Sequence, residues 1–284
     1  MQIIDIHTHL PFTREMVMDK RNLEFIAQSG LEFPRECKAS SLISAMDAAG
    51  VDKACIMGPN PAENIAYTND MVAAAVSAFP ERLSGFMGVN PFISKEELGR
   101  QFDRFMQNDG FKGVGELGGY DLLTPQCCLI YEKCIEKDIP VLIHTGFPLP
   151  SMYMKYCHPQ VIDQIAVRYP ELRLIMAHTA FPWIIDALGV VIRHKNVYID
   201  VSNLLSFGEL IFRTVLITFT QSRLGDRILF GTDFPGSLPD RYISKIRRIN
   251  INSFIAFVLR IPRISKKDIG NILGGNAARL LKLP

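Results

Sequence analysis

The chain has 284 residues, of which 48% are hydrophobic and 21% are charged, and these ordinary globular values exclude a disordered or fibrous protein. Its formal net charge of +2 gives no electrostatic reason to expect a nucleic-acid partner. No apolar run approaches the length that crosses a bilayer, and a strand predicted from residue 3 leaves no room for a signal peptide, so we expect a cytoplasmic protein with no membrane partner.

The first predicted strand spans residues 3–9 and contains the sequence H-T-H. Side chains alternate along a strand, so His7 and His9 project from the same face with Cα atoms about 6.6 Å apart. Two imidazoles at that spacing can bind one metal ion, although an H-x-H pair also arises by chance and is a weak signal alone. The pair lies at the carboxyl end of its strand, where a barrel of parallel strands keeps its chemistry.

Short apolar runs alternate with amphipathic helical stretches along the whole chain, a pattern typical of a parallel sheet with helical crossovers. The predicted strands are residues 3–9, 51–57, 83–89, 112–117, 140–144, 173–178, 197–201 and 227–233. Eight such units close into an α/β fold of the TIM-barrel, or (β/α)8, type. No linker or repeat divides the sequence, so we expect a single domain over residues 1–284 with extra C-terminal helices.

The helices between these strands have recognisable start signals. Ser94 with Glu97 matches a capping box, and Ser265 opens a final helix in the same way. Proline follows Thr124 and His158, in the favoured first-turn position. We therefore expect helices to begin directly after these four residues.

Two connections are longer than a crossover requires, residues 10–39 and residues 145–157. Both begin at the strand ends where a barrel enzyme binds substrate, so we expect them to form walls of the binding site. Arg14 and Arg35 in the first connection could contact an anionic substrate, although surface arginines are common.

Polar residues end four of the later predicted strands. Glu116 lies at the tip of the fourth strand in G-V-G-E-L-G, His144 and His178 end the fifth and sixth, and Asp233 ends the eighth in G-T-D-F-P. Any one of them could simply begin a loop, but coincidence at five strand tips, counting the H-T-H pair, is improbable. Imidazoles and carboxylates gathered at a water-poor barrel mouth need a shared cation.

The other histidines and the cysteines have simpler explanations. His158 is expected to start a helix, and His194 suits the negative end of a helix dipole. The six cysteines form no C-x-x-C pair, so we expect reduced, packed thiols.

The chain resembles the amidohydrolase superfamily, in its amidohydrolase-2 branch, which includes metal-dependent decarboxylases and lactone hydrolases. The resemblance covers nearly the whole chain and is carried by D-I-H-T-H-L, F-P-E-R-L-S-G-F-M-G-V-N-P, V-L-I-H-T-G, M-A-H-T-A-F-P-W, G-T-D-F-P and I-L-G-G-N-A-A-R-L-L. It implies a TIM barrel that binds one or two divalent metals.

The resemblance also implies roles for the six strand-tip residues. His7, His9, His144 and Asp233 would be metal ligands, and His178 would be a further ligand or a catalytic acid/base. Decarboxylases of the branch do not, as a rule, rely on a carboxylate at the tip of the fourth strand. Glu116 instead resembles the bridging carboxylate of relatives with two metals.

Our leading hypothesis is a hydrolase that uses a metal-activated water to cleave an ester, lactone, amide or related bond in a small molecule, with Asp233 taking the proton from that water. Mixed nitrogen and oxygen ligands favour zinc, with manganese, iron or nickel as alternatives. A decarboxylase with one metal, in which His178 assists proton transfer to carbon, is the alternative. A barrel that has lost catalysis and serves as a binding protein is a third, and the complete set of six candidate ligands argues against it.

Specificity is less well defined by the sequence. Residues that follow predicted strands and could line the substrate site are Tyr120, Phe147, Met152, Tyr153, Asn203 and Phe234, which would make the site partly apolar. Each is equally explained by loop packing. A homodimer is a reasonable expectation because closed homo-oligomers are common.

Overall fold

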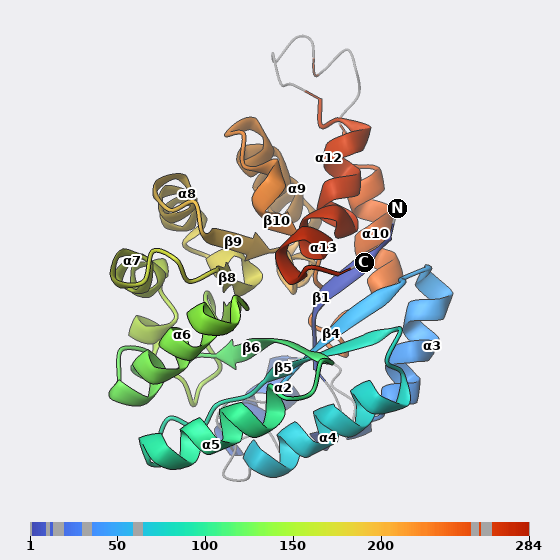
Figure 1. The fold of residues 1–284 in the computed structure, drawn as a ribbon. Helices are drawn as coiled ribbons and strands as arrows, with labels where there is room; N and C mark the ends of the chain where they lie inside the picture. The colour runs from blue at the N-terminus through green and yellow to red at the C-terminus, as the bar shows by residue number, and fades with distance from the viewer. Residues whose placement is uncertain are drawn as a thin grey trace.

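Eight strands form a barrel with helices around its outside (Figure 1) in the computed structural model, which describes residues 2–9, 12–13, 20–29, 36–58, 65–250, 256 and 263–283. In sheet order the strands are β1 (Ile4–His9), β4 (Lys53–Met57), β5 (Leu83–Met87), β6 (Phe111–Leu117), β7 (Val141–Ile143), β8 (Leu174–Met176), β9 (Val197–Asp200) and β10 (Ile228–Leu229). All neighbouring pairs are parallel. The predicted TIM barrel is therefore confirmed, and each predicted strand overlaps one observed strand.

The barrel closes through backbone hydrogen bonds between β1 and the segment that runs through and beyond β10. Ile6 N donates to Phe230 O at 2.9 Å, Asp233 N to His7 O at 2.8 Å, and His9 N to Phe234 O at 2.7 Å. These bonds continue past the end of β10 itself. They hold the backbone at Asp233 in a fixed register with the two histidines of the first strand.

The helices cover the outside of the barrel (Figure 1). They are α3 (Ala39–Ala49), α4 (Ile65–Ala78), α5 (Lys95–Phe105), α6 (Pro125–Lys137), α7 (Pro159–Arg168), α8 (Ile184–Arg193), α9 (Glu209–Gln221) and α10 (Pro239–Arg247), with α12 (Lys266–Gly270) and α13 (Asn276–Leu281) at the C-terminus. Among the described ranges, no helix combines the length and apolar character that a membrane crossing requires.

The predicted helix starts are confirmed. Ser94, Thr124 and His158 each accept a hydrogen bond from a backbone N–H in the first turn of the following helix. At the final helix Ser265 forms a complete capping box. At α5 only half of the predicted box is present, because the Glu97 carboxylate accepts hydrogen bonds from Arg100 and Gln101.

Two hydrophobic clusters lie on opposite sides of the sheet. The inner cluster fills the barrel and includes Ile4, Ile6, Phe86, Leu142 and Ile175. The larger outer cluster packs the strands against the surrounding helices. The five cysteines whose side chains the structure describes are free and buried, as expected for packed thiols: Cys55, Cys127, Cys128, Cys134 and Cys157. The side chain of Cys37 is not among those described.

The C-terminal helices cover one end of the barrel. Ala277 and Leu280 of α13 join the inner cluster, and the buried Asn276 side chain donates to Gly225 O at 2.8 Å and Ile228 O at 2.7 Å. Between α12 and α13 the chain makes a π-helical turn, η5 (Asn271–Gly275), against β1 and β10. This end is opposite the carboxyl ends of the strands, which leaves the other end for chemistry.

The first long connection contains a short antiparallel pair, β2 (Phe12–Thr13) with β3 (Glu36–Cys37), and helix α2 (Lys20–Ser29). The side chain of Asn22 contacts Ser151 in the second long connection, donating to its Oγ at 2.8 Å and accepting from its N at 3.0 Å. The two connections therefore meet, as expected for two walls of one site. Arg14 and Arg35 lie outside the described residues.

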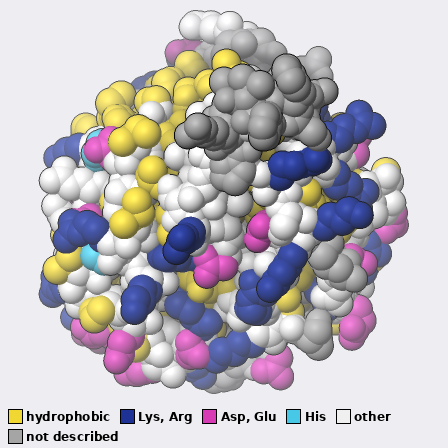
Figure 2. All heavy atoms as spheres, turned by 90° about the horizontal axis from the view of Figure 1, so that it is seen from above, with side chains coloured by type: hydrophobic (Ala, Val, Ile, Leu, Met, Phe, Trp, Pro, Cys, Tyr) yellow, Lys and Arg dark blue, Asp and Glu magenta, His cyan; other side chains and the backbone are white. Residues whose placement is uncertain are grey.

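Acidic and basic side chains are interspersed on the face shown in Figure 2. Ion pairs such as Arg104 with Asp70 and Arg193 with Asp163 likewise place opposite charges side by side. This distribution agrees with the small net charge.

The close contact between the C-terminal turn and the first strand generates a stability prediction. A Cβ added at Gly274 would lie 2.0 Å from Gln2 O, whereas one added at Gly189, exposed on α8, would meet nothing within 4 Å. Gly274→Ala should therefore destabilise the protein by about 1–3 kcal/mol through overpacking. Gly189→Ala should stabilise it by about 0.5–1 kcal/mol through helix propensity.

The urea midpoint of each variant measures these effects. The packing described for η5 would be contradicted if Gly274→Ala kept the wild-type urea midpoint, or if both variants shifted the midpoint in the same direction.

Candidate metal centre

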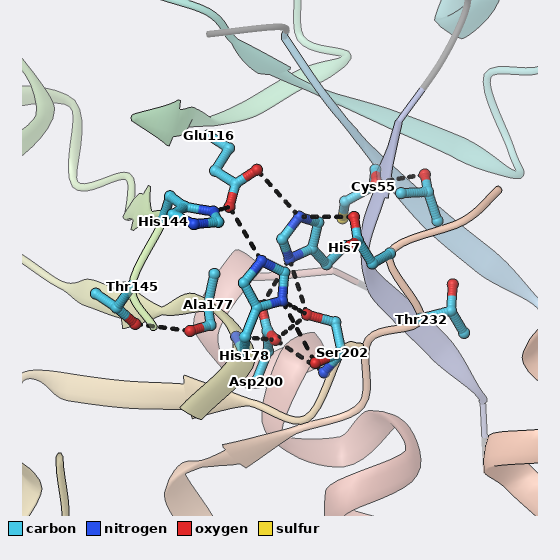
Figure 3. A network of polar contacts seen from close by, with 12 residues as sticks. His7, Cys55, Glu116, His144, Thr145, Ala177, His178, Asp200, Ser202 and Thr232 are labelled. Atoms are coloured by element: carbon cyan, nitrogen blue, oxygen red, sulfur yellow. Dashed lines mark hydrogen bonds and ion pairs between the residues drawn. The ribbon is translucent and has the colours of Figure 1, made fainter. Parts of the chain in front are cut away.

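Six polar side chains converge at the carboxyl ends of the strands, four of them within the network of Figure 3. They come from five of the eight strands or from the residues just after them: His7, His9, Glu116, His144, His178 and Asp233. The structure thus brings together all six strand-tip residues singled out in the sequence.

Glu116 lies at the centre of this group. Its Oε1 is 2.8 Å from His144 Nδ1 and 3.4 Å from His178 Nε2. Its Oε2 is 3.3 Å from His9 Nε2 and 3.5 Å from His7 Nε2. Burial raises the pKa of Glu116, but the charges of His7 and His144 outweigh it and hold the pKa well below its usual value. A buried, ionised carboxylate therefore faces two histidine pairs, one with each oxygen.

The first histidine pair also contacts Asp233. His7 Nε2 and His9 Nε2 are 3.0 Å apart, and Asp233 Oδ1 is 3.1 Å from His9 Nε2 and 3.7 Å from His7 Nε2. Burial raises the pKa of Asp233, but its hydrogen bond with His9 and nearby imidazole charges lower it to about 2. Burial lowers the pKa of His9, and hydrogen bonds to Asp233 and Glu116 raise it to about 9.

Irregular strand pairing accompanies two of these side chains. Ile4 and Ile6 belong to the inner cluster, so strict alternation would point His7 the other way. The register of β1 on β4 shifts between Asp5 and Thr8, and the register of β6 on β7 shifts between Val114 and Leu117, around Glu116. Irregularities of this kind re-aim a side chain and are frequent next to active sites.

Glycine allows the close approach of the strands that carry Glu116 and His144. A Cβ at Gly118 would lie 2.6 Å from His144 Cβ, and His144 N donates to Leu117 O at 2.6 Å. Any larger residue at Gly118 would push His144 away from Glu116.

Left-handed backbone turns present His178 and Asp233. The predicted sixth strand ends early, at Met176, and His178, Thr179 and Ala180 have φ values of 57°, 46° and 52°. Asp233 has a φ of 62°. Such conformations are unfavourable for residues with a Cβ and persist only where surrounding contacts impose them.

Side-chain hydrogen bonds stabilise the turn at His178. Thr145 Oγ1 donates to Ala177 O at 2.6 Å, Thr179 Oγ1 donates to Asp200 O at 2.7 Å, and His178 N donates to Asp200 Oδ1 at 3.0 Å. These bonds come from the neighbouring strands, so the turn is fixed by tertiary contacts.

Asp200 is a residue of this network that the sequence analysis missed. Its fully buried carboxylate contacts His7 Nδ1 at 2.8 Å, and Ser202 Oγ is 2.8 Å from His178 Nδ1 (Figure 3). Burial raises the pKa of Asp200, but the charges of His7 and His178 and the hydrogen bonds with His7 and Ser202 together outweigh it and lower the pKa. Asp200 ends an apolar strand in V-Y-I-D, so the rule that identified the other strand-tip residues could have found it.

Asp5 was also missed, because it lies inside the first strand. Its Oδ1 accepts from His7 N at 3.2 Å and Thr232 N at 3.1 Å, and its Oδ2 accepts from Thr232 Oγ1 at 2.6 Å. Burial raises its pKa to about 7. Asp5 thus joins the first strand to the segment that carries Asp233.

The residues present fit a divalent cation. Two overlapping sets of side chains offer ligand atoms within 4.8 Å of one another: His7, His9 and Asp233, and His7, Glu116 and His178. His144 Nε2 is buried and has no hydrogen-bond partner among the described residues. Imidazole nitrogens and carboxylate oxygens are the ligands of zinc and of several other first-row metals.

The four predicted substrate-binding residues occupy different environments. Phe234 is buried beside Asp233, and its carbonyl accepts from His9 N. Phe147 is half exposed, with its ring 6.3 Å from that of Phe207. Asn203 has a left-handed backbone at the start of a short turn, and Tyr120 is buried in the outer cluster.

The other residues considered in the sequence lie apart from the six. Met152 packs beside Gly119, and Tyr153 is exposed. His158 caps α7, and His194 at the end of α8 bonds to Asp163 Oδ1 at 2.8 Å.

Solved structures share this fold. An uncharacterised TIM-barrel protein from Bordetella bronchiseptica is 23% identical, with a TM-score of 0.75 over 100% of this chain and 99% of that one. A probable 2-pyrone-4,6-dicarboxylic acid hydrolase from Acinetobacter baumannii, with citric acid bound, is 16% identical, with a TM-score of 0.65 over 99% and 100%. A dihydroxybenzoic acid decarboxylase from Polaromonas sp. JS666, with manganese and the inhibitor 2-nitroresorcinol, is 19% identical, with a TM-score of 0.67 over 99% and 97%.

Sequence comparison identifies the family. No curated protein matches the chain. The family model described as amidohydrolase, of the amidohydrolase-2 type, matches residues 4–283. Because this match includes every residue of the converging group and nearly the whole barrel, the chain belongs to the amidohydrolase family.

Proposed function

We propose that the protein is a metal-dependent hydrolase that cleaves an ester, lactone, amide or related bond in a small molecule. The position of Glu116 carries this proposal, because each of its oxygens faces a different pair of imidazoles. A carboxylate between two ligand sets is suited to bridge two metal ions. Hydrolytic sites with two metals place the ions about 3.5–4 Å apart.

The chain's residues divide between two such positions. His7, His9 and Asp233 would hold one ion, His144 and His178 would hold the other, and Glu116 would contact both. A bound divalent ion supplies Lewis acidity and lowers the pKa of water toward about 7. Zinc suits this ligand set, and the manganese in the Polaromonas decarboxylase keeps manganese among the candidates.

Asp233 is the residue best placed to move a proton. Its pKa of about 2 keeps it ionised at neutral pH. The side chains of Asp233 and His9 are 23% and 22% exposed, more than those of Glu116, His144 and His178. Asp233 can therefore accept a proton on the side open to substrate and pass it to a leaving group, a role worth about 10²- to 10⁴-fold in rate.

Aromatic rings from several loops at this end of the barrel support a substrate with an apolar part. Phe147 contacts Phe25 and Phe207 with ring centroids 6.3 Å apart in each case, and Phe207 stacks on Phe181 at 4.2 Å. These rings come from the segments that follow the barrel strands β1, β7, β8 and β9. A site with a polar centre and an aromatic wall is typical of small-molecule binding.

A decarboxylase with one ion is the second candidate. The manganese-containing Polaromonas decarboxylase shares the fold, and His178 is buried with a raised pKa because Glu116 and Asp233 outweigh the effect of burial. A protonated His178 could deliver a proton to carbon. The contacts of Glu116 with four imidazoles, two at each oxygen, favour hydrolysis over decarboxylation.

Metal stoichiometry tests the two-ion site. Protein purified without added metal should retain about two ions per chain, measured by inductively coupled plasma mass spectrometry, and Glu116→Gln should retain about one or fewer. The variant keeps the side-chain shape but replaces one acceptor oxygen with an N–H donor.

Glu209→Gln is the matched control, because Glu209 pairs with Arg213 on α9 and Lys245 on α10 and contacts none of the six. An unchanged metal count in Glu116→Gln would contradict the bridging role.

A substrate panel tests the reaction. The metal-loaded protein should hydrolyse members of a lactone, ester and amide panel, and Asp233→Asn should lower kcat by about 10²- to 10⁴-fold, because the amide cannot act as a base. Release of carbon dioxide from aromatic or unsaturated carboxylates, with no hydrolysis of the panel, would favour the decarboxylase instead.

A further inference from the structure

The imidazoles of His7 and His178 are contacted by a buried carboxylate and a buried hydroxyl on the side away from Glu116 (Figure 3). Asp200 and Ser202 are both fully buried, and they contact Nδ1 of His7 and His178. The mechanism proposed above gives them no role. Their hydrogen bonds nevertheless determine which nitrogen of each ring carries a hydrogen.

The Asp200 carboxylate leaves one choice for His7. Its Oδ1 accepts from the backbone N–H groups of His178 and Ser202, each at 3.0 Å, and from the Ser202 hydroxyl. Its Oδ2 is 2.8 Å from His7 Nδ1. An ionised carboxylate can only accept hydrogen bonds. His7 Nδ1 must therefore carry the hydrogen.

The Ser202 hydroxyl leaves one choice for His178. A hydroxyl has a single hydrogen, and the close contact of Ser202 Oγ with Asp200 Oδ1 needs that hydrogen, because two oxygens without one would repel. The hydroxyl can then only accept from His178 Nδ1, which lies 2.8 Å away. His178 Nδ1 must therefore also carry a hydrogen.

Both rings consequently present Nε2 as a lone pair toward Glu116. His7 Nε2 is 3.5 Å from Glu116 Oε2, and His178 Nε2 is 3.4 Å from Glu116 Oε1. A nitrogen lone pair that faces a carboxylate oxygen repels it unless a cation lies between them. That cation is a metal ion or, in the metal-free protein, a proton. We infer that Asp200 is a positioning residue that fixes both imidazoles as Nε2 ligands of the metal centre. It acts directly on His7 and, through Ser202, on His178.

This inference rests on the proposed metal function, but its central element can be measured without metal. Two-bond ¹H–¹⁵N correlation spectra of the metal-free protein, with labelled histidine, should show a hydrogen on Nδ1 of both His7 and His178. Because these N–H groups are buried, they should exchange slowly with water.

Two variants should act on different histidines. In Asp200→Asn the amide oxygen keeps the three donors at Oδ1, so the NH₂ group faces His7 Nδ1 and should abolish its N–H while His178 keeps its own. In Ser202→Ala, His178 loses the hydroxyl acceptor and should exchange faster. His7 loses only the longer contact with Ser202 Oγ, at 3.2 Å, and should keep its Nδ1 hydrogen on Asp200 Oδ2 at 2.8 Å. General loosening of the structure would affect both rings together, so this crossed pattern distinguishes positioning from a merely structural role.

Zinc affinity, measured by competition with a chromogenic chelator, gives the second readout. Asp200→Asn should weaken Zn²⁺ binding by about 10- to 100-fold. Asp163→Asn is the matched control, since Asp163 contacts His194 Nε2 at 2.8 Å outside the centre; it should shift the His194 resonances and leave Zn²⁺ affinity within about twofold. If Asp200→Asn does not fold, the spectrum of Ser202→Ala decides.

The outcomes separate the two proposals. The positioning role would be overturned if Nδ1 of His7 or His178 carried no hydrogen in the wild-type protein. It would also be overturned if a folded Asp200→Asn variant kept its Zn²⁺ affinity. Wild-type protein that shows both Nδ1 hydrogens but binds no Zn²⁺, Mn²⁺, Fe²⁺ or Ni²⁺ would support the assigned tautomers and overturn the proposed metal function.

Discussion

A buried carboxylate surrounded by imidazoles is the constraint on which this site depends. Glu116 is almost fully buried and keeps its charge only because four histidines lie within about 3.5 Å of its two oxygens. Burying one charge without a partner would cost several kcal/mol. Without a cation, the tautomers imposed on His7 and His178 would leave lone pairs pointing at that carboxylate. A shared cation would resolve this arrangement, so electrostatics and hydrogen bonding both favour a cation at this position.

The barrel supplies the geometry that this centre requires. Backbone hydrogen bonds between β1 and the segment after β10 bring Asp233 to the first histidine pair, and the same bonds close the barrel. The left-handed turn at His178 is held by hydrogen bonds with Thr145 and Asp200, which lie on or next to neighbouring strands. Stability and function therefore share contacts at this end. At the opposite end, Ala277 and Leu280 of α13 pack into the inner cluster.

Much of this organisation could be predicted from the sequence, because it follows from local pattern. Apolar runs marked all eight strands, and the prolines after Thr124 and His158 marked helix starts because proline suits the first turn of a helix. The six strand-tip residues were identifiable because parallel strands end at a common edge. The amidohydrolase-2 resemblance agrees with the family match over residues 4–283.

The features that could not be predicted depend on contacts between distant segments. The sixth strand ends two residues early because tertiary hydrogen bonds force His178 into a left-handed turn. The register shifts beside His7 and Glu116 likewise depend on the neighbouring strands. Asp200 was recognisable as a strand tip, but its contact with His7 is visible only in three dimensions. Side chains on the loops, such as Tyr120 and Phe147, carry no pattern that separates packing from binding.

A crystal structure of the purified protein, measured at the absorption edge of the metal it contains, tests the metal centre most directly. We expect anomalous peaks with one on each side of the Glu116 carboxylate, enclosed by His7, His9, Glu116, His144, His178 and Asp233. A metal-free protein with the six side chains bonded only to one another, or a metal bound elsewhere, would contradict it.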